Sequence, residues 1–163
     1  IAYYDATNKD LKYAAWNGSW TTETVDSPGD VGQYASLALD GAGNPRIAYY
    51  DATDKDLKYA AWNGTSWDIE TVDSSGDVGK YASLALGASG KARIAYYDAT
   101  GGNLKYAGLN VSIWLIGTVD TGPSGGTNNV GQYASLAITS ADLMTIAYHD
   151  VTGVDLFLIS EQP

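Results

Sequence analysis

A repeat dominates the sequence and constrains the fold more than any other feature. Segments beginning Ile-Ala-Tyr recur with spacings of 46, 47 and 52 residues, and they start at Ile1, Ile47, Ile94 and Ile146. The resulting units are residues 1–46, 47–93, 94–145 and a truncated 146–163. The fourth unit also drifts in sequence, as capping units do. We interpret the whole chain, residues 1–163, as one repeat domain of about 3.5 units.

Each unit is expected to form strands rather than helices. Short runs rich in Tyr, Val, Ile, Thr and Trp are separated by clusters of Gly, Asn, Asp and Ser. No long segment keeps a helical apolar period, which predicts that the chain has no helix. Asn17-Gly18 and Asn63-Gly64 predict tight hairpin turns, because these residue types tolerate a positive φ. One expected set of four strands is Tyr81–Leu86, Ile94–Tyr97, Leu104–Ala107 and Trp114–Val119.

Four strands in a repeat of this length are typical of a β-propeller blade. The alternatives are a β-solenoid, whose coils are usually shorter, and tandem β-sandwiches, which need about 100 residues each. We therefore predict an all-β fold of the β-propeller type, with four-stranded antiparallel blades. Propellers close with about 4–8 blades, so roughly 3.5 units leave the terminal blades incomplete. Either the chain is part of a longer array, or copies complete one another as a homo-oligomer or polymer.

The charge balance argues against several classes of partner. The chain has 19 acidic and 9 basic residues and a net charge of −10, and such a surface repels phosphate backbones and anionic lipid. We therefore expect no nucleic-acid binding. We also expect no membrane insertion, because no apolar run approaches the length of about 18 residues that a membrane helix needs. Cysteine is absent and His149 is the single histidine, which argues against thiolate chemistry and His-based metal clusters. The chain opens at Ile1 rather than Met, and we interpret it as a mature product or an excised segment.

About half of each unit resembles the blades of Aleuria-type fucose-binding propeller lectins. The residues that carry the resemblance are Ile47-Ala48-Tyr49-Tyr50-Asp51, Leu57, Trp62-Asn63-Gly64 and Trp67, with matching residues between Ile1 and Trp20. The resemblance implies sugar sites between neighbouring blades, built from an Arg, a Glu and aromatic residues. It also implies that a short chain can build a propeller by oligomerising.

The charged residues of such a sugar site recur only in part. Arg46 and Arg93 lie just before the matching strand, where the last unit has Thr145. Glu23 and Glu70 recur on a later strand of the first two units. We therefore take Arg46 and Arg93 as candidate ligand-binding residues.

The aromatic residues divide into candidate ligand contacts and candidate packing residues. Trp16 and Trp62 precede a tight turn and are expected near a loop edge, where they either stack on the apolar face of a sugar or pack at the rim. Tyr4 and Tyr50 belong to consecutive tyrosine pairs, whose members point to opposite faces of a sheet; they either contact ligand or are buried. The tryptophans that we expect to pack between neighbouring blades are Trp20, Trp67 and Trp114.

Two repeated polar features have both a functional and a structural interpretation. Aspartates in two equivalent loops can offer oxygen ligands to Ca²⁺, although we favour a Gly-containing turn whose aspartates cap backbone N–H groups. These aspartates are Asp26, Asp30, Asp73 and Asp77. N-glycosylation sequons open at Asn17, Asn63 and Asn110. The sequons lie at equivalent turns and can also reflect one turn copied three times. We expect the protein to need no cofactor, and Ca²⁺ is the alternative.

The sequence favours a binding function over catalysis. His149 stands where the other units have Tyr and is interpreted as a tolerated substitution on a strand, and the carboxylate pairs lack a signature of glycoside hydrolysis. We predict a non-enzymatic extracellular or cell-surface module that binds glycans multivalently, because equal sites multiply weak affinities. The alternatives are a self-assembling structural subunit of a filament or surface layer and, third, a fragment of a propeller glycosidase.

Overall fold

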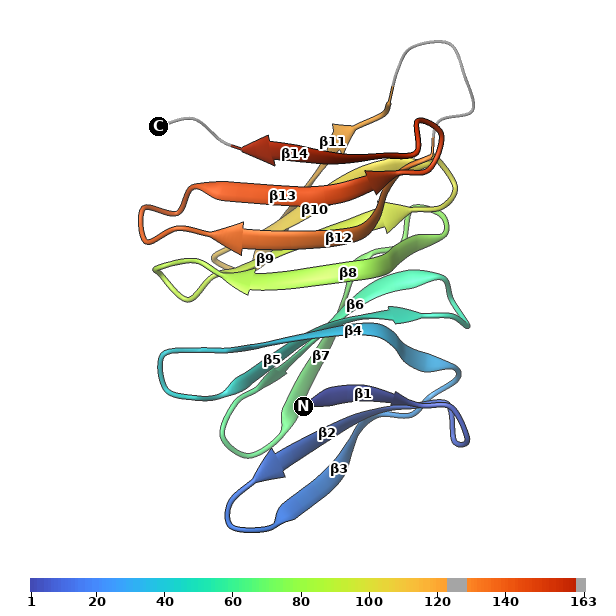
Figure 1. Ribbon diagram of the computed structural model, residues 1–163. Helices are drawn as coiled ribbons and strands as arrows, with labels where there is room; N and C mark the ends of the chain where they lie inside the picture. Colours follow the sequence, from blue (N-terminus) through green and yellow to red (C-terminus); the bar gives the residue numbers. More distant parts are fainter. Residues whose placement is uncertain (123–128, 161–163) are drawn as a thin grey trace.

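The computed structural model describes residues 1–122 and 129–160, and strands are the regular elements of this part (Figure 1). The strands form four antiparallel sheets, which we name first to fourth in chain order. The first sheet contains β1 (Ala2–Asp5), β2 (Asp10–Trp16) and β3 (Trp20–Asp26). The second sheet contains β4 (Val31–Leu39), β5 (Pro45–Asp51), β6 (Asp56–Trp62) and β7 (Trp67–Asp73). The third sheet contains β8 (Val78–Leu86), β9 (Ala92–Asp98), β10 (Asn103–Asn110) and β11 (Ile113–Asp120). The fourth sheet contains β12 (Val130–Ile138), β13 (Met144–Asp150) and β14 (Asp155–Ser160).

The sheets confirm the predicted all-β architecture of four-stranded antiparallel units. Within each sheet the strands pair in chain order, and the four sheets are stacked along the molecule (Figure 1). The first sheet has the equivalents of β5, β6 and β7, whereas the fourth has the equivalents of β8, β9 and β10. About 3.5 units are therefore present, as the repeat predicts. In the described residues no helix is long and apolar enough to cross a membrane.

Polar turns between the second and third strands of a unit are built by an aspartate. The Oδ1 atom of Asp51 accepts hydrogen bonds from the backbone N–H groups of Thr53 and Asp54, at 2.9 and 3.2 Å. Lys55 then adopts a positive φ of 66° and leads into β6. Because the carboxylate satisfies the N–H groups of the turn, the Asp-Ala-Thr motif of the repeat has a local structural role.

Neighbouring sheets approach each other most closely at a glycine in the first strand of a unit. Gly79 of β8 has a φ of +106°, and a Cβ atom at this position would lie 2.7 Å from the Cα atom of Leu57 in the second sheet. Gly32 and Gly131 make the same approach to their preceding sheets. Only glycine combines this backbone conformation with so little space, so the Val-Gly pair of the repeat sets the spacing between sheets.

A polar contact joins each sheet to the one before it. The Asp26 carboxylate at the end of β3 accepts hydrogen bonds from the Tyr49 hydroxyl and the Lys58 ammonium group, both at 2.6 Å. Asp73 accepts the same pair of donors from Tyr96 and Lys105 of the third sheet, at 2.7 and 2.5 Å. We call this arrangement the carboxylate clasp. Its three members come from two sheets, so it fixes their relative position.

The clasp is modified between the third and fourth sheets. Tyr148 donates a hydrogen bond to Asp120 as before, but Phe157 stands at the position of the lysine. The Phe157 ring stacks on Tyr148, with centroids 5.9 Å apart and an interplanar angle of 20°. An aromatic contact therefore replaces the ammonium group at this junction.

The predicted role of the repeated tryptophans is confirmed at two of three positions. Trp67 makes an edge contact with Tyr13 of the first sheet, with centroids 5.6 Å apart, and Trp114 makes the same contact with Tyr59 of the second at 5.2 Å. Trp20 differs, because 57% of its surface is exposed. It lies in the first sheet, which has no preceding sheet in the described chain to pack against.

Candidate functional site

A hollow between the first and second sheets brings a candidate tryptophan next to a carboxylate. Its volume is about 260 Å³. The residues that line it are Tyr13, Glu23, Gly43, Asn44, Pro45 and Trp62. We call it the Trp62 hollow. Two sheets and the β4–β5 loop contribute to it, so it exists only where sheets are stacked.

The aromatic side chains of the hollow are held by contacts with one another. The rings of Trp62 and Trp67 meet edge to face, with centroids 5.5 Å apart, and the Trp67 ring in turn meets Tyr13. The Trp67 indole Nε1–H donates to Glu23 Oε1 at 3.1 Å. Glu23 is therefore oriented toward the second sheet by an indole, and its carboxylate belongs to the lining of the hollow.

Arg46 stabilises the edge of the Trp62 hollow through two hydrogen bonds. Its Nη1 donates to the backbone carbonyl of Trp62 and its Nη2 to Asp40 Oδ2, both at 2.8 Å. Both side chains of the Arg46–Asp40 ion pair are mostly buried, with 21% and 16% exposed. The structure thus places two of the predicted residues, Arg46 and Trp62, side by side.

The equivalent residues of other sheets do not reproduce this arrangement. Arg93 donates to the carbonyls of Ala92 and Leu109, and Leu109 stands where Trp62 would be expected. Trp16 is 63% exposed and contacts Trp20 on the first sheet. Arg93 therefore keeps the backbone contact that Arg46 makes, but a leucine stands beside it in place of the tryptophan, so among the described contacts the predicted Arg and Trp meet at Trp62.

The predicted tyrosines lie at the opposite end of the strands from Trp62. Tyr50 pairs with Leu57 at the start of β6, whereas Trp62 ends this strand. The Tyr50 hydroxyl donates to Asp77 at 2.8 Å, and the Tyr4 hydroxyl donates to Asp30 at the same distance. Burial and the Asp77 carboxylate raise the pKa of Tyr50. Tyr4 and Tyr50 therefore form no joint site with Trp62, and ligand contact by these tyrosines stays a prediction.

A row of tyrosines was missed at the sequence level. Tyr34, Tyr81 and Tyr133 lie in β4, β8 and β12, and their ring centroids are 4.6 and 4.4 Å apart in succession. Each has a positive φ, between 52° and 54°, which is unusual for a bulky residue. We call this row the tyrosine ladder. The sequence feature that could have indicated the ladder is the Gly-x-Tyr motif, which recurs in three units.

The tyrosine ladder is supported from behind by Tyr50, one of the two candidate tyrosines. Tyr50 makes an edge contact with Tyr34, with centroids 6.2 Å apart. Register shifts on both sides of Gln33 bend β4 at this point and turn Tyr34 outward, leaving 40% of its surface exposed. Burial, together with the hydroxyl of Tyr133, raises the pKa of Tyr81. The ladder is thus an exposed aromatic surface held in a strained backbone.

The aspartates considered for Ca²⁺ bind protein donors instead. Asp26 and Asp73 are the acceptors of the carboxylate clasps. Asp30 accepts hydrogen bonds from Tyr4 and Gln33, and Asp77 from Tyr50 and Lys80. No group of three or more His, Cys, Asp or Glu able to hold a metal ion occurs in residues 1–122 and 129–160. These contacts agree with the favoured structural interpretation, because ammonium, amide and hydroxyl groups already bind these carboxylates and Asp73 accepts a hydrogen bond from the Ser75 N–H group.

Burial and hydrogen bonding act in opposite directions on the pKa of Asp73. Burial alone disfavours the carboxylate, but the hydrogen bonds from Lys105 and Tyr96 outweigh it and hold the pKa of Asp73 below its ordinary value. Burial and the Asp73 carboxylate raise the pKa of Tyr96. Asp73 is therefore ionised and Tyr96 protonated at neutral pH, which suits a structural contact.

The three sequons lie at exposed positions where the last two strands of their sheets meet. Asn17, Asn63 and Asn110 are all exposed. The Asn63 Oδ1 atom accepts hydrogen bonds from the backbone N–H groups of Thr65 and Ser66, both at 3.0 Å. This contact gives Asn63 a role in the turn itself, and modification of the three asparagines stays a prediction.

Comparison with known proteins identifies the fold. No family model matches the chain, and no curated protein matches it. Among solved structures, the fungal lectin of Aleuria aurantia, described as a six-bladed β-propeller with a fucose recognition mode, superposes with a TM-score of 0.64 at 19% identity. The match covers 93% of this chain and 48% of the lectin. The fold is that of a β-propeller. Each sheet is a blade, complete or partial, and the chain spans about half the length of this lectin.

Two further solved structures are similar in fold. A fucose lectin from Kordia zhangzhouensis, solved with methyl-fucoside, has a TM-score of 0.54 at 19% identity, covering 78% of this chain and 91% of the lectin. The NanB sialidase of Streptococcus pneumoniae has a TM-score of 0.58 at 14% identity, covering 98% of this chain and 27% of the sialidase. The likeness predicted from the aromatic strand and turn residues is confirmed at the level of the fold.

Proposed function

We propose that this chain is a non-enzymatic carbohydrate-binding propeller module and that the Trp62 hollow is its sugar site. The observation that carries the proposal is the meeting of Trp62, Tyr13 and Glu23 in one hollow between two sheets. Aromatic rings stack on the apolar C–H face of a sugar, and a carboxylate accepts hydrogen bonds from its hydroxyl groups. The hollow combines these two kinds of contact.

The similar solved structures support this proposal through their own ligands. Two of those described above are fucose lectins, and one was solved with methyl-fucoside. The sialidase raises the alternative of glycoside hydrolysis. Against it, the Glu23 carboxylate is bound to an indole, and among residues 1–122 and 129–160 no second carboxylate lines the Trp62 hollow to form a hydrolytic pair.

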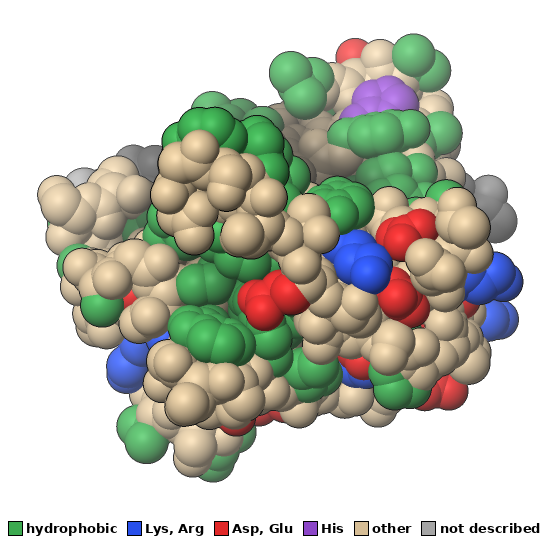
Figure 2. Space-filling view, turned by 90° about the horizontal axis from the view of Figure 1, so that it is seen from below, with side chains coloured by type: hydrophobic (Ala, Val, Ile, Leu, Met, Phe, Trp, Pro, Cys, Tyr) green, Lys and Arg blue, Asp and Glu red, His purple; other side chains and the backbone are tan. Residues whose placement is uncertain are grey.

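A second proposal concerns assembly. The terminal sheets expose large apolar side chains, with Trp20 57% and Leu158 66% exposed. Figure 2, seen from below, shows hydrophobic side chains in patches among polar and charged ones. We infer that the terminal sheets associate with further copies of the chain, as a closed oligomer or a polymer. We also propose that the module acts outside the cell or on its surface. Such an assembly would carry several sugar sites and so raise the overall affinity for a glycan surface. The same assembly is also expected for the alternative function, a structural subunit of a filament or surface layer.

The sugar proposal is tested by glycan-array screening followed by calorimetry with the best ligand, starting with methyl-fucoside. Trp62→Ala removes a ring from the hollow, and Glu23→Gln removes the negative acceptor, so each is expected to weaken binding about tenfold or more. Trp16→Ala is the matched control, because Trp16 precedes the same kind of turn but lies outside the hollow. Absence of sugar binding, or an equal effect of the Trp16 and Trp62 variants, would refute the assignment.

A further inference from the structure

The tyrosine ladder repeats the same strained backbone at three equivalent positions. The φ angles of Tyr34, Tyr81 and Tyr133 are 53°, 54° and 52°, in the left-handed region that a bulky residue rarely adopts. Such strain persists only where the surrounding structure compensates for it, and it concentrates at functional sites. Because all three copies have it, the placement of these rings is a property of the repeat and not of one unit.

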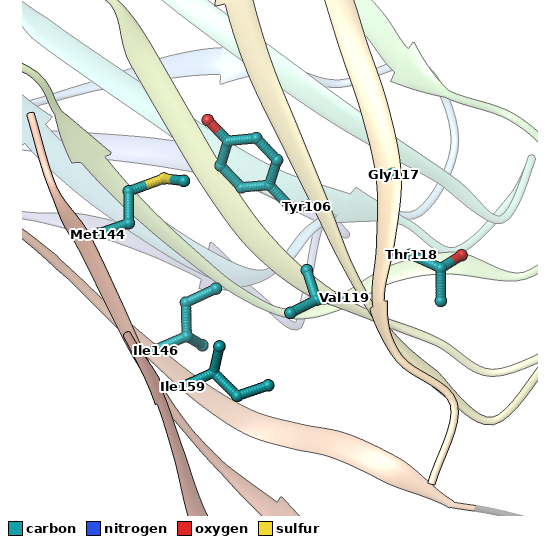
Figure 3. A pocket seen from close by; sticks show the side chains of 7 residues that line it. All are labelled: Tyr106, Gly117, Thr118, Val119, Met144, Ile146 and Ile159. Atoms are coloured by element: carbon teal, nitrogen blue, oxygen red, sulfur yellow. The ribbon is translucent and has the colours of Figure 1, made fainter. Parts of the chain in front are cut away.

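A tyrosine in a packing position has a regular strand backbone in this chain. Tyr106 of β10 pairs with Ala95 in antiparallel register. Figure 3 shows its ring beside the side chains of Val119 and Ile146, which line a hollow of about 280 Å³ together with it. Packing between sheets is thus achieved without a positive φ, so packing alone does not account for the strain of the tyrosine ladder.

The rings of the tyrosine ladder are in direct contact with one another. The centroids of Tyr34 and Tyr81 are 4.6 Å apart with an interplanar angle of 55°, and those of Tyr81 and Tyr133 are 4.4 Å apart at 45°. Aromatic pairs usually have centroids about 4.5–7 Å apart, so both distances lie at the short end of the range. Tyr34 and Tyr133 are 40% and 66% exposed, and Tyr81 is half-buried between them. Adjacent phenol rings are therefore held together where a small oxidant reaches them.

We propose that the tyrosine ladder is a site of oxidative cross-linking, at which Tyr81 is joined to Tyr133 or to Tyr34 as dityrosine. The oxidant is hydrogen peroxide activated by a haem peroxidase. Each phenol loses one electron and its hydroxyl proton, and the two radicals join through a C–C bond between ring carbons ortho to the oxygens. The hydrogens on these two carbons are then replaced by protons on the two oxygens, which restores the phenols. One hydrogen peroxide takes up the two electrons and two protons and becomes two molecules of water.

The contact between the rings favours coupling within one chain. Radicals on separate chains have to meet by diffusion, whereas rings held side by side react with a high effective molarity. Tyr50 and Tyr97 lie behind the ladder, with their centroids 6.2 Å from those of Tyr34 and Tyr81. They are only 4% and 7% exposed. The pairs within the ladder are both closer and more accessible, so they are expected to react first.

Each cross-link joins two sheets covalently. Tyr34, Tyr81 and Tyr133 lie on β4, β8 and β12, the first strands of the second, third and fourth sheets. A bond between two of them closes a loop about one unit long and restricts the unfolded chain, as a disulfide does. The chain contains no cysteine. Coupling of tyrosines therefore gives this repeat a covalent link between sheets that disulfides cannot supply.

The experiment treats the full chain, at low micromolar concentration, with a haem peroxidase and hydrogen peroxide. Mass spectrometry should show a monomer that has lost two hydrogen atoms for each cross-link and that has dityrosine fluorescence. Trypsin separates the three tyrosines, because Arg46 lies between Tyr34 and Tyr81, and Lys91 between Tyr81 and Tyr133. The joined peptides therefore identify the bond. The Tm of the cross-linked monomer should be about 5 °C or more above that of the untreated chain.

Tyrosine-to-phenylalanine variants test the position of the bond. Tyr81→Phe removes the central phenol and should lower the dityrosine yield of the monomer about fivefold or more, because a phenyl ring forms no phenoxyl radical. Tyr133→Phe should leave the bond between Tyr34 and Tyr81. Tyr3→Phe is the matched control and should not change the yield. Tyr3 is 38% exposed, close to the value of Tyr34, but it belongs to none of the aromatic ring pairs found in residues 1–122 and 129–160.

Several outcomes would overturn the proposal. One is absence of dityrosine from the treated monomer when circular dichroism shows that it is folded. Another is coupling that occurs mainly between chains, or joined peptides that place the bond outside the ladder. Equal yields from the Tyr81→Phe and Tyr3→Phe variants would also contradict it. None of these results depends on sugar binding, so the test is independent of the proposed lectin function.

Discussion

Removal of the lysine from one carboxylate clasp should destabilise the fold strongly and in a pH-dependent manner. Lys105 and Asp73 have side chains that are 11% and 2% exposed, with Nζ and Oδ2 2.5 Å apart. In Lys105→Met most of the apolar volume is kept, but the Asp73 carboxylate loses its cation and keeps the hydroxyl of Tyr96. Deleting one partner of a buried ion pair costs about 3–5 kcal/mol. We expect a loss of about 3 kcal/mol at pH 7, equivalent to roughly 6–12 °C in Tm.

The pH dependence follows from the direction of the Asp73 shift. Its pKa is held below the ordinary value of 3.8 in the folded protein, so its stabilising contribution is present above that value and is lost as the pH falls through the folded pKa. In the variant, burial without the ammonium group favours the protonated acid. The difference in unfolding free energy between the two proteins should therefore shrink below about pH 4.

Urea denaturation at pH 7 and pH 3, followed by tryptophan fluorescence, measures this difference. Lys12→Met is the matched control, because Lys12 holds the same position in the first sheet but bonds Thr24 and lies 3.8 Å from Asp10, outside any clasp. The control should lose less than about 1 kcal/mol. Equal losses for the two variants, or a loss at Lys105 that persists unchanged at pH 3, would refute the reasoning.

Other predictions concern the backbone, the tyrosines and the Trp62 hollow. Gly79→Ala should cost more than about 2 kcal/mol in urea denaturation, because its Cβ would meet the backbone of Leu57, whereas Gly90→Ala, at a positive φ in open space, should cost about 1 kcal/mol. Burial and carboxylate contacts raise the pKa of Tyr49 and Tyr96, so stability should fall as the pH rises above the ordinary tyrosine value of 10.0; phenolate absorbance and denaturation check this together. The sugar titration described above completes the set.

The fold was accessible from the sequence because its determinants are local and repeated. The Asn-Gly turns, the strand composition and the repeat length each act within one unit, and they predict strands and blades directly. Trp67 and Trp114 were assigned correctly for the same reason, since every interior unit has the same neighbours. Trp20 departs from the pattern because its environment depends on whether another sheet precedes it, which residues near Trp20 cannot encode.

The candidate site was harder to predict because its residues come from different units. Glu23 lies beside Trp62 only after two sheets stack, although the two residues are far apart in sequence. Tyr50 and Trp62 are close in sequence yet lie at opposite ends of paired strands. The tyrosine ladder depends on a bulge and a positive φ at Tyr34, which strand propensity does not reveal. Contacts between units, rather than patterns within them, therefore decide the chemistry.

The carboxylate clasp gives the array a direction. Each interior sheet offers an aspartate to the sheet that follows and reaches back with a tyrosine to the sheet before, so no sheet can be reversed without leaving acceptors opposite acceptors. Coupling is confined to nearest neighbours, and the energetics resemble those of a one-dimensional chain of like links. Whole units can then be gained or lost by duplication and deletion while every junction keeps its donors and acceptors. Such a chain can change in length during evolution without redesigning its core.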